Sequence, residues 1–215
     1  EYRGFMISSG GEGSHIRLDP KIKDVFIIDE NNLGAGYFTD LGLKIRWNPE
    51  RALNNLVTRY ISLDKHAKDQ YGIRLTERPY EIGVTDPDTS FDNGYVPGCA
   101  GDFTDSQNAK AAWLNDPNVS CFIYTNRIKK YAQDYWPLVQ KHYEPQGINN
   151  WEGLAEMARN MVIAHELGHA VNLQNLASGQ IHCPDENCII WRSINWLGIQ
   201  TSFCSETRQN VSLYK

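Results

Sequence analysis

The feature that most constrains this chain is the pentad His165-Glu166-Leu167-Gly168-His169. Two histidines four positions apart lie one turn above each other on an α-helix, so both imidazoles can reach the same metal ion. Neutral imidazole is a good zinc ligand, and Glu166 lies where a carboxylate can act on water bound to that metal. The pentad therefore predicts a helix that carries a metal centre.

The residues around the pentad favour an amphipathic helix whose second half is buried. At about 100° per residue, one face collects apolar residues and both histidines, and the opposite face collects charged residues. The first face holds Leu154, Ala158, Met161, Val162, His165 and His169, and the second holds Glu152, Glu156 and Arg159. The alternative is a pair of core histidines without a metal. That alternative would bury the Glu166 carboxylate between them, which is costly without a metal or a partner.

Length and charge bound the class of protein. The chain has 215 residues and a net charge of −5, which favours one domain, with room for two lobes and a proper core. Lysine and arginine are scattered rather than gathered in a stripe, so nothing predicts a nucleic-acid partner or an anionic membrane surface. No apolar run approaches the ~20 residues of a membrane span.

Local patterns predict strands mixed with long helices, and therefore an α/β or α+β protein rather than an all-helical one. Apolar runs and alternation predict four strands, and a Gly- and Asp-rich loop over 89–105 is expected to lead into a short exposed edge strand. The four strands are 24–29, 43–47, 80–85 and 120–125. Helices are expected at about 50–71, at about 129–143 with a break or kink near Pro137, and from Trp151 with Asn150 as its cap.

The sequence after the pentad resembles the metzincin metalloproteases, whose long motif HExxHxxGxxH is followed by a methionine-containing turn. It is most similar to the archaemetzincins, in which a cysteine, four residues, a cysteine, one residue and a methionine follow that motif. Cys183, Cys188 and Ile190 reproduce this spacing, with isoleucine in place of methionine. Cys204 and Thr207 resemble a remnant of the CxxC that ends the archaemetzincin pattern. The resemblance covers about residues 154–207.

The third metal ligand is where the sequence departs from the family motif. Asn175 holds the place of the third histidine, and its amide oxygen is a poor zinc ligand beside imidazole. His182 offers the right donor directly before Cys183, and the longer loop that it needs adds only about 0.7 kcal/mol of closure entropy. We therefore predict that His165, His169 and His182 bind the metal, with Asn175 or an acidic residue as the alternative third ligand.

The cysteines allow two interpretations. In the archaemetzincins four cysteines hold a second, structural zinc, whereas here Thr207 replaces the fourth cysteine and makes a complete second site doubtful. The preferred interpretation is two disulfides with Cys204 left free, which implies an oxidising compartment and a secreted protein. Reduced cysteines would instead indicate a cytoplasmic protein. The expected disulfides are Cys183–Cys188 and Cys99–Cys121.

The resemblance implies a zincin-like fold in a single catalytic domain over residues 1–215. Its N-terminal lobe, to about residue 172, would hold a mixed twisted sheet, a backing helix and the active-site helix, and its C-terminal lobe would span about 173–215. It implies a monomeric zinc-dependent endopeptidase, with Glu166 as the general base that passes a proton to the leaving amine. An extended peptide or protein substrate would pair with the edge strand.

Two other functions stay open at this point. Glu206 lies in a stretch that could be helical, and it could be the third ligand of a gluzincin-type metallopeptidase. The chain could also be a non-catalytic binding protein that keeps zinc for stability. Tyr214 could assist the oxyanion from the C-terminal tail, although a lone tyrosine there is more often surface packing.

Overall fold

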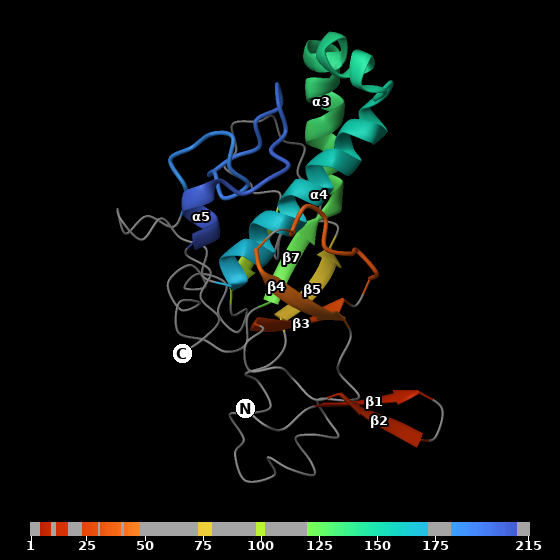
Figure 1. The fold of residues 1–215 in the computed structure, drawn as a ribbon. Coiled ribbons are helices and arrows are strands. Elements are labelled where there is room, and N and C mark those ends of the chain that lie inside the picture. Colours follow the sequence, from red (N-terminus) through yellow and green to blue (C-terminus); the bar gives the residue numbers. More distant parts are fainter. Residues whose placement is uncertain are drawn as a thin grey trace.

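The computed structural model describes residues 5–9, 12–16, 23–29, 31–39, 41–47, 73–78, 98–101, 120–171 and 182–209. This part of the chain is a mixed α/β structure, with a five-stranded sheet, a separate two-stranded hairpin and two long helices (Figure 1). The strands are β1 (Phe5–Ser9), β2 (Glu12–Ile16), β3 (Lys23–Asp29), β4 (Leu43–Trp47), β5 (Ile73–Arg78), β6 (Gly98–Gly101) and β7 (Ser120–Tyr124). The helices are α3 (Thr125–Tyr143), the 3-10 turn η2 (Glu144–Gln146), α4 (Trp151–Ala170) and α5 (Ser205–Gln209).

The larger sheet has the strand order β4-β3-β5-β7-β6. The first four strands are parallel to their neighbours, and β6 is an antiparallel edge strand against β7. Apolar side chains of the inner strands are fully buried, among them Ile27, Leu75 and Ile123, as expected for parallel strands covered by helices. The predicted mixed sheet is thus confirmed.

Most strand predictions inside the described residues are confirmed. The runs at 24–29, 43–47 and 120–125 form β3, β4 and β7, and the edge strand expected after the glycine-rich loop is β6. Strand β5, in which buried Ile73 and Leu75 alternate with polar and charged residues, was not among the predicted strands. The helix predicted at 50–71 and the strand predicted at 80–85 lie outside the described residues.

The helix α3 begins earlier than predicted and is not broken at Pro137. The chain passes directly from β7 into the helix at Thr125, whose hydroxyl donates a hydrogen bond to the Arg78 carbonyl (3.2 Å). Gly147, with φ 86°, then turns the chain back, and α4 runs alongside α3 in the opposite direction (Figure 1). The predicted cap of α4 is confirmed, because the Asn150 side chain accepts a hydrogen bond from the Gly153 N–H (2.9 Å).

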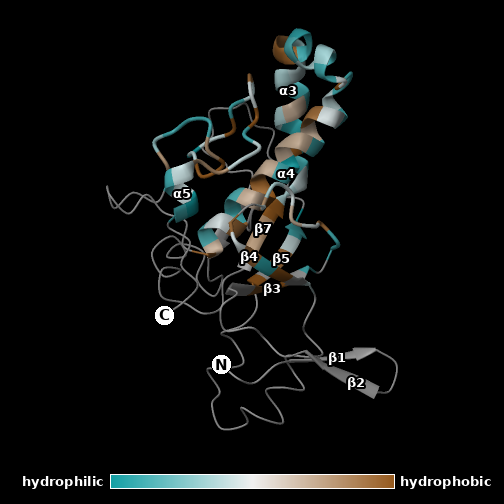
Figure 2. Cartoon of the chain, in the orientation of Figure 1, coloured by the Kyte–Doolittle hydropathy of each residue, from teal (hydrophilic) through white to brown (hydrophobic). Residues whose placement is uncertain are grey.

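The second half of α4 forms the centre of the core, as the sequence predicted. Helix α4 packs against β6 and β7, and Figure 2 shows hydrophobic segments within α4 and along β7. No side chain of its turn Met161–Ala164 is more than 2% exposed. This burial anchors the helix that carries the pentad.

The loop over residues 31–39 holds α4 from a second side. The Asp29 carboxylate accepts hydrogen bonds from the backbone N–H groups of Leu33 (2.9 Å) and Gly34 (2.8 Å), which fixes the loop. The Tyr37 N–H then donates to the Asn160 carbonyl of α4 (3.1 Å). Gly36, at φ 54°, lies so close that an added Cβ would be 2.2 Å from that carbonyl oxygen.

Beyond α4, residues 182–204 contain no helix and only an isolated bridge between Cys188 and Ser202. The buried Gln200 side chain ties this segment together by donating to the carbonyls of Glu186 (2.9 Å) and Ser193 (3.1 Å). The Tyr143 hydroxyl accepts a hydrogen bond from the Ile199 N–H (3.0 Å), which attaches the segment to α3. Among the helices that the structure describes, none is long and apolar enough to cross a membrane.

Candidate metal centre

The two histidines of the pentad face each other on adjacent turns of α4. Their Nε2 atoms are 2.9 Å apart, and their ring centroids are 4.5 Å apart. The separation follows from the helix, because residues four apart lie on the same face one turn above each other. Helix α4 therefore presents His165 and His169 as a preformed pair of nitrogen donors.

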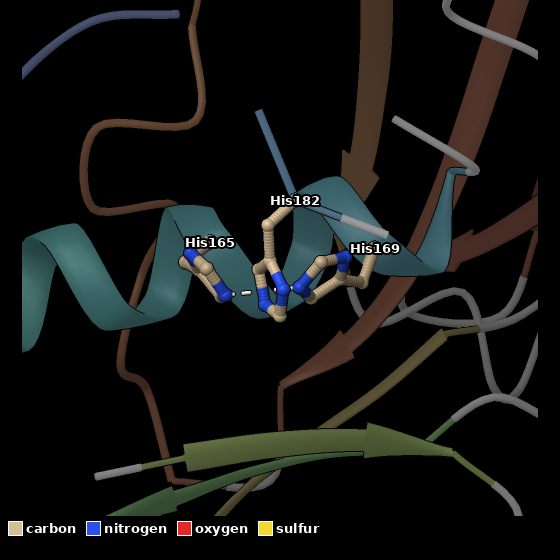
Figure 3. A group of neighbouring side chains, drawn as sticks. All are labelled: His165, His169 and His182. Carbon is tan, nitrogen blue, oxygen red and sulfur yellow. Dashed lines mark hydrogen bonds between the residues drawn. The ribbon is translucent and has the colours of Figure 1, made fainter. Parts of the chain in front are cut away.

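His182 reaches this pair from the loop that begins the C-terminal segment. Its ring centroid lies 5.5 Å from that of His165 and 5.1 Å from that of His169. One ligand nitrogen from each of the three residues lies within 4.8 Å of the others, and Figure 3 shows the rings converging. We call His165, His169 and His182 the histidine cluster.

Of the alternative ligands that the sequence left open, the structure describes Glu206. Glu206 is exposed on α5, so the predicted helical stretch is present but its carboxylate is not part of the histidine cluster. Asn175 and Tyr214 lie outside the described residues.

A backbone carbonyl orients His165. The Nδ1 atom of His165 is 2.6 Å from the Ile189 carbonyl oxygen, and since that oxygen can only accept, Nδ1 carries the proton. The lone pair of His165 is therefore on Nε2, which faces His169. Ile189 and Ile190 are fully buried. The contact with the Ile189 carbonyl could not be predicted, because a main-chain acceptor leaves no sequence signal.

The surroundings favour neutral imidazoles. Burial lowers the pKa of His165 to about 4 and holds the pKa of His169 well below 6.5. Burial, helped by the nearby Arg192, also lowers the pKa of the half-buried His182. A metal needs neutral imidazole with a free lone pair. All three side chains are thus in the ligating protonation state at neutral pH.

Glu166 is 5% exposed, and burial raises the pKa of its carboxyl to about 8. Without a cation nearby the carboxyl holds its proton at neutral pH. A positive charge within a few ångströms would favour the ionised form instead. Glu166 is thus a buried carboxyl of raised proton affinity on the helix that carries both pentad histidines.

The donor set fits a transition-metal ion. Two ligands of a tetrahedral zinc at about 2.0–2.1 Å stand roughly 3.3 Å apart, which is close to the 2.9 Å between the two Nε2 atoms of the pentad. Imidazole suits zinc, copper, iron and nickel. Among the described residues this cluster holds three side-chain donors, the number that leaves one position open on a tetrahedral ion.

A second group of donors lies directly beside the first. Cys183, Cys188 and Cys204, which we call the cysteine cluster, bring their sulfur atoms within 4.8 Å of one another. All three are free cysteines, and the sulfur atoms of Cys183 and Cys204 are 3.6 Å apart. The predicted Cys183–Cys188 disulfide is therefore wrong. The physical reason is that Cys204 approaches the same point, so three thiols share it.

Thr207, which the sequence placed at the missing fourth cysteine, completes the cysteine cluster with a hydroxyl group. Its oxygen lies 3.3 Å from the sulfur of Cys188 and 3.1 Å from that of Cys204. Burial raises the pKa of Cys183 to about 12. Burial acts to raise the pKa of Cys204 too, but hydrogen bonds from Thr207 outweigh it and hold that pKa below 9.0.

The predicted Cys99–Cys121 disulfide is also absent. Cys121 is buried in β7 and forms no disulfide. The antiparallel register pairs Cys121 with Ala100, and it pairs Cys99 with Phe122. The two cysteines are therefore not opposite each other in the sheet.

Comparison with known proteins finds no matching family model, no matching curated protein and no matching solved structure. The geometry of the two clusters and the chemistry of their side chains are therefore what indicates a function.

Proposed function

We propose that this chain is a zinc-dependent endopeptidase with a zincin-like architecture. The observation that carries the proposal is the histidine cluster, two of whose members come from α4 and one from a separate loop. Glu166, which lies between the helical pair in the sequence, is buried. Three nitrogen ligands are the arrangement of catalytic zinc sites, whereas structural sites are usually closed by four ligands. This comparison favours catalysis over a zinc-stabilised binding protein.

The residues of the chain have separable roles in this proposal. Zinc bound there would supply a Lewis acid that polarises a carbonyl and acidifies water. Glu166 accepts the proton of the attacking water and returns it to the leaving amine. Its buried surroundings suit this role, because they raise the proton affinity of the carboxyl. The Ile189 carbonyl keeps the His165 ring in the tautomer that ligates through Nε2.

The proposed substrate is a peptide or protein in extended form. Strand β6 is the edge of the sheet and packs near the helix that carries the pentad. An extended segment could add to this edge through main-chain hydrogen bonds, which requires no particular side chain. We propose a monomer without nucleic-acid or membrane partners, as the scattered charges predict.

A second ion, of structural type, is part of the proposal. Three sulfur donors that meet at one point favour a thiophilic cation such as zinc, and they replace the disulfides that the sequence favoured. Thiols used in this way suit a reducing compartment. We therefore propose a cytoplasmic rather than a secreted protein.

The decisive experiment compares Glu166→Gln with the wild type and with Glu152→Gln, which changes an exposed glutamate in the first turn of the same helix. Loss of the general base should lower the rate of casein or quenched-peptide cleavage by about 100- to 10,000-fold. Bound zinc, measured by atomic absorption, should not change, because Glu166 is not a ligand. Glu152→Gln should cleave like the wild type.

The outcomes separate the rival functions. Equal cleavage by Glu166→Gln would refute the mechanism. Zinc bound by the wild type without any cleavage would support the zinc-stabilised binding protein. A strong chelator should abolish cleavage, and added zinc should restore it.

A further inference from the structure

The cysteine cluster is joined by covalent bonds to the groups that complete the histidine cluster. Cys183 follows His182 directly, and Cys188 precedes Ile189, whose carbonyl orients His165. Consecutive Cα atoms are about 3.8 Å apart, so a shift of either cysteine moves its neighbour. Two of the three cysteines are thus direct chain neighbours of His182, a member of the histidine cluster, and of Ile189, whose carbonyl contacts it.

Hydrogen bonds close the short loop between these two cysteines. The Cys183 N–H donates to the Ile190 carbonyl (3.0 Å), and the Ile189 N–H donates to the Ser202 carbonyl (3.1 Å). The Cys204 N–H points at the Cys188 sulfur (3.3 Å). The backbone of this loop and the segment that carries Cys204 therefore form one connected unit with His182 and the Ile189 carbonyl.

The sulfur atoms at the centre of this unit have only weak interactions of their own. A thiol is a weak hydrogen-bond donor and a weak acceptor, and residues 182–204 contain no helix or extended strand pairing. A thiophilic cation bound to all three sulfurs would join the loop at Cys183 and Cys188 to the segment at Cys204. Such a cation would add to the hydrogen bonds that already link these two segments.

We propose that occupancy of the cysteine cluster by a thiophilic cation controls the metal affinity of the histidine cluster. The occupied cysteine cluster holds His182 and the Ile189 carbonyl in place, so the histidine cluster binds with three ligands. With the cysteine cluster empty, the loop no longer fixes the third ligand. The inference rests on the metal site of the proposed function but not on peptidase activity, and the coupling must be reciprocal.

The two clusters differ in donor chemistry, so they can be loaded and observed separately. Thiolates favour soft cations, and imidazoles bind cobalt(II) and zinc well. Cadmium(II) bound to the cysteine cluster gives a near-ultraviolet thiolate charge-transfer band. Cobalt(II) bound by the histidine cluster gives visible ligand-field bands without a thiolate contribution. Each site thus has a readout that does not involve substrate cleavage.

The first experiment uses the full-length wild-type chain, reduced and free of metal. Cobalt(II) affinity of the histidine cluster is measured with the cysteine cluster empty, and then with one equivalent of cadmium(II) present. We expect cadmium to strengthen cobalt binding by about 10- to 100-fold, the usual effect of groups that orient metal ligands. Equal affinity in both states, or no cadmium–thiolate band, would overturn the inference.

The second experiment uses Cys204→Ser, because Cys204 is far in sequence from His182 and can act on it only through the cysteine cluster. We expect cobalt affinity to fall about 10- to 100-fold, with no gain on adding cadmium. Cys121→Ala is the matched control, since it removes a buried thiol outside both clusters. Unchanged affinity in Cys204→Ser would refute the coupling, and if this variant does not fold, the wild-type titration decides alone.

The results also separate this inference from the proposed function. Coupled metal binding without peptide cleavage would support the inference and refute the endopeptidase. Peptide cleavage with uncoupled metal binding would support the endopeptidase and refute the inference.

Discussion

The histidine and cysteine clusters each gather three donor atoms within 4.8 Å, but the chain assembles them in different ways. Two of the histidines come from consecutive turns of α4, whose backbone hydrogen bonds set their separation before any ion arrives. The cysteines come from a loop and from the residue before α5, where no regular element sets their separation. A helix supplies the donor geometry by itself, whereas a loop needs a cross-link.

The largest expected effect tests the one histidine that comes from a loop. A structural zinc site contributes roughly 10–16 kcal/mol, or about 4 kcal/mol for each ligand. His182→Ala should therefore weaken zinc binding about 1,000-fold, measured by competition with a chromophoric chelator. Asn175→Ala should change it little, and His142→Ala, at an exposed position on α3, is the control. The reverse ranking would make Asn175 the third ligand.

A substitution at Gly36 tests whether the loop over 31–39 holds the helix that carries the pentad. Alanine there would place its Cβ 2.2 Å from the Asn160 carbonyl oxygen, whereas alanine at Gly34, also at positive φ, meets nothing within 4 Å. Both changes carry backbone strain, so their difference isolates the contact with α4. We expect Gly36→Ala to lower the free energy of unfolding by about 1–3 kcal/mol more than Gly34→Ala. Equal losses in urea unfolding would show that the loop does not hold the helix.

The buried Glu166 predicts how pH acts on the metal-free protein. Because folding lowers the pKa values of the three histidines, these groups destabilise the folded state at acidic pH, and the free energy of unfolding rises with pH until this penalty ends at about pH 6.5. The raised pKa of Glu166 lowers the free energy of unfolding as pH rises. The unfolded chain releases this proton above about pH 4.5, whereas the folded chain keeps it to about pH 8.

Between pH 6.5 and 8 the free energy of unfolding should therefore fall, by up to about 1.4 kcal/mol per pH unit. Urea unfolding of wild type and Glu166→Gln across this interval measures the effect. The variant should show a flatter profile. A parallel fall in both proteins would mean that Glu166 is ionised in the folded metal-free state.

The smallest effect is expected at the start of α4. Asn150→Ala removes the side chain that caps the helix, at a cost of about 1 kcal/mol of stability. Zinc affinity should stay unchanged, because the histidines lie at the opposite end of the helix. Asn149→Ala, at the exposed position before it, is the control. A loss of zinc affinity in Asn150→Ala would show that the helix does not set the donor geometry alone.

Local sequence signals predicted the elements that depend on local physics. The apolar runs of β3 and β7 and the capped start of α4 each follow from short-range patterns, and all are present. Strand β5 was not predicted, because charged residues at alternate positions are not typical of a strand in the centre of a sheet. Pro137 did not end α3, so tertiary context outweighed the local signal.

The candidate site also has parts that local sequence signals predict and parts that they do not. The helical spacing of His165 and His169 could be read from the sequence, and donor chemistry pointed to His182 across the intervening loop. The resemblance placed Cys204 in the same pattern as Cys183 and Cys188, but the spacing of the cysteines could not decide between a disulfide and three thiols that share one position. The contact between His165 and the Ile189 carbonyl could not be predicted for a different reason. Every residue has a backbone carbonyl, so the sequence does not show which one accepts the bond.

The bond from the Tyr37 N–H to the Asn160 carbonyl also limits the length of α4. Inserting or deleting one residue between Asn160 and His165 would rotate both pentad histidines by about 100° relative to the loop, away from His182. Exchanging one apolar residue for another of similar volume in this stretch should cost less than about 1.5 kcal/mol. Here the number of residues is constrained more tightly than their identity.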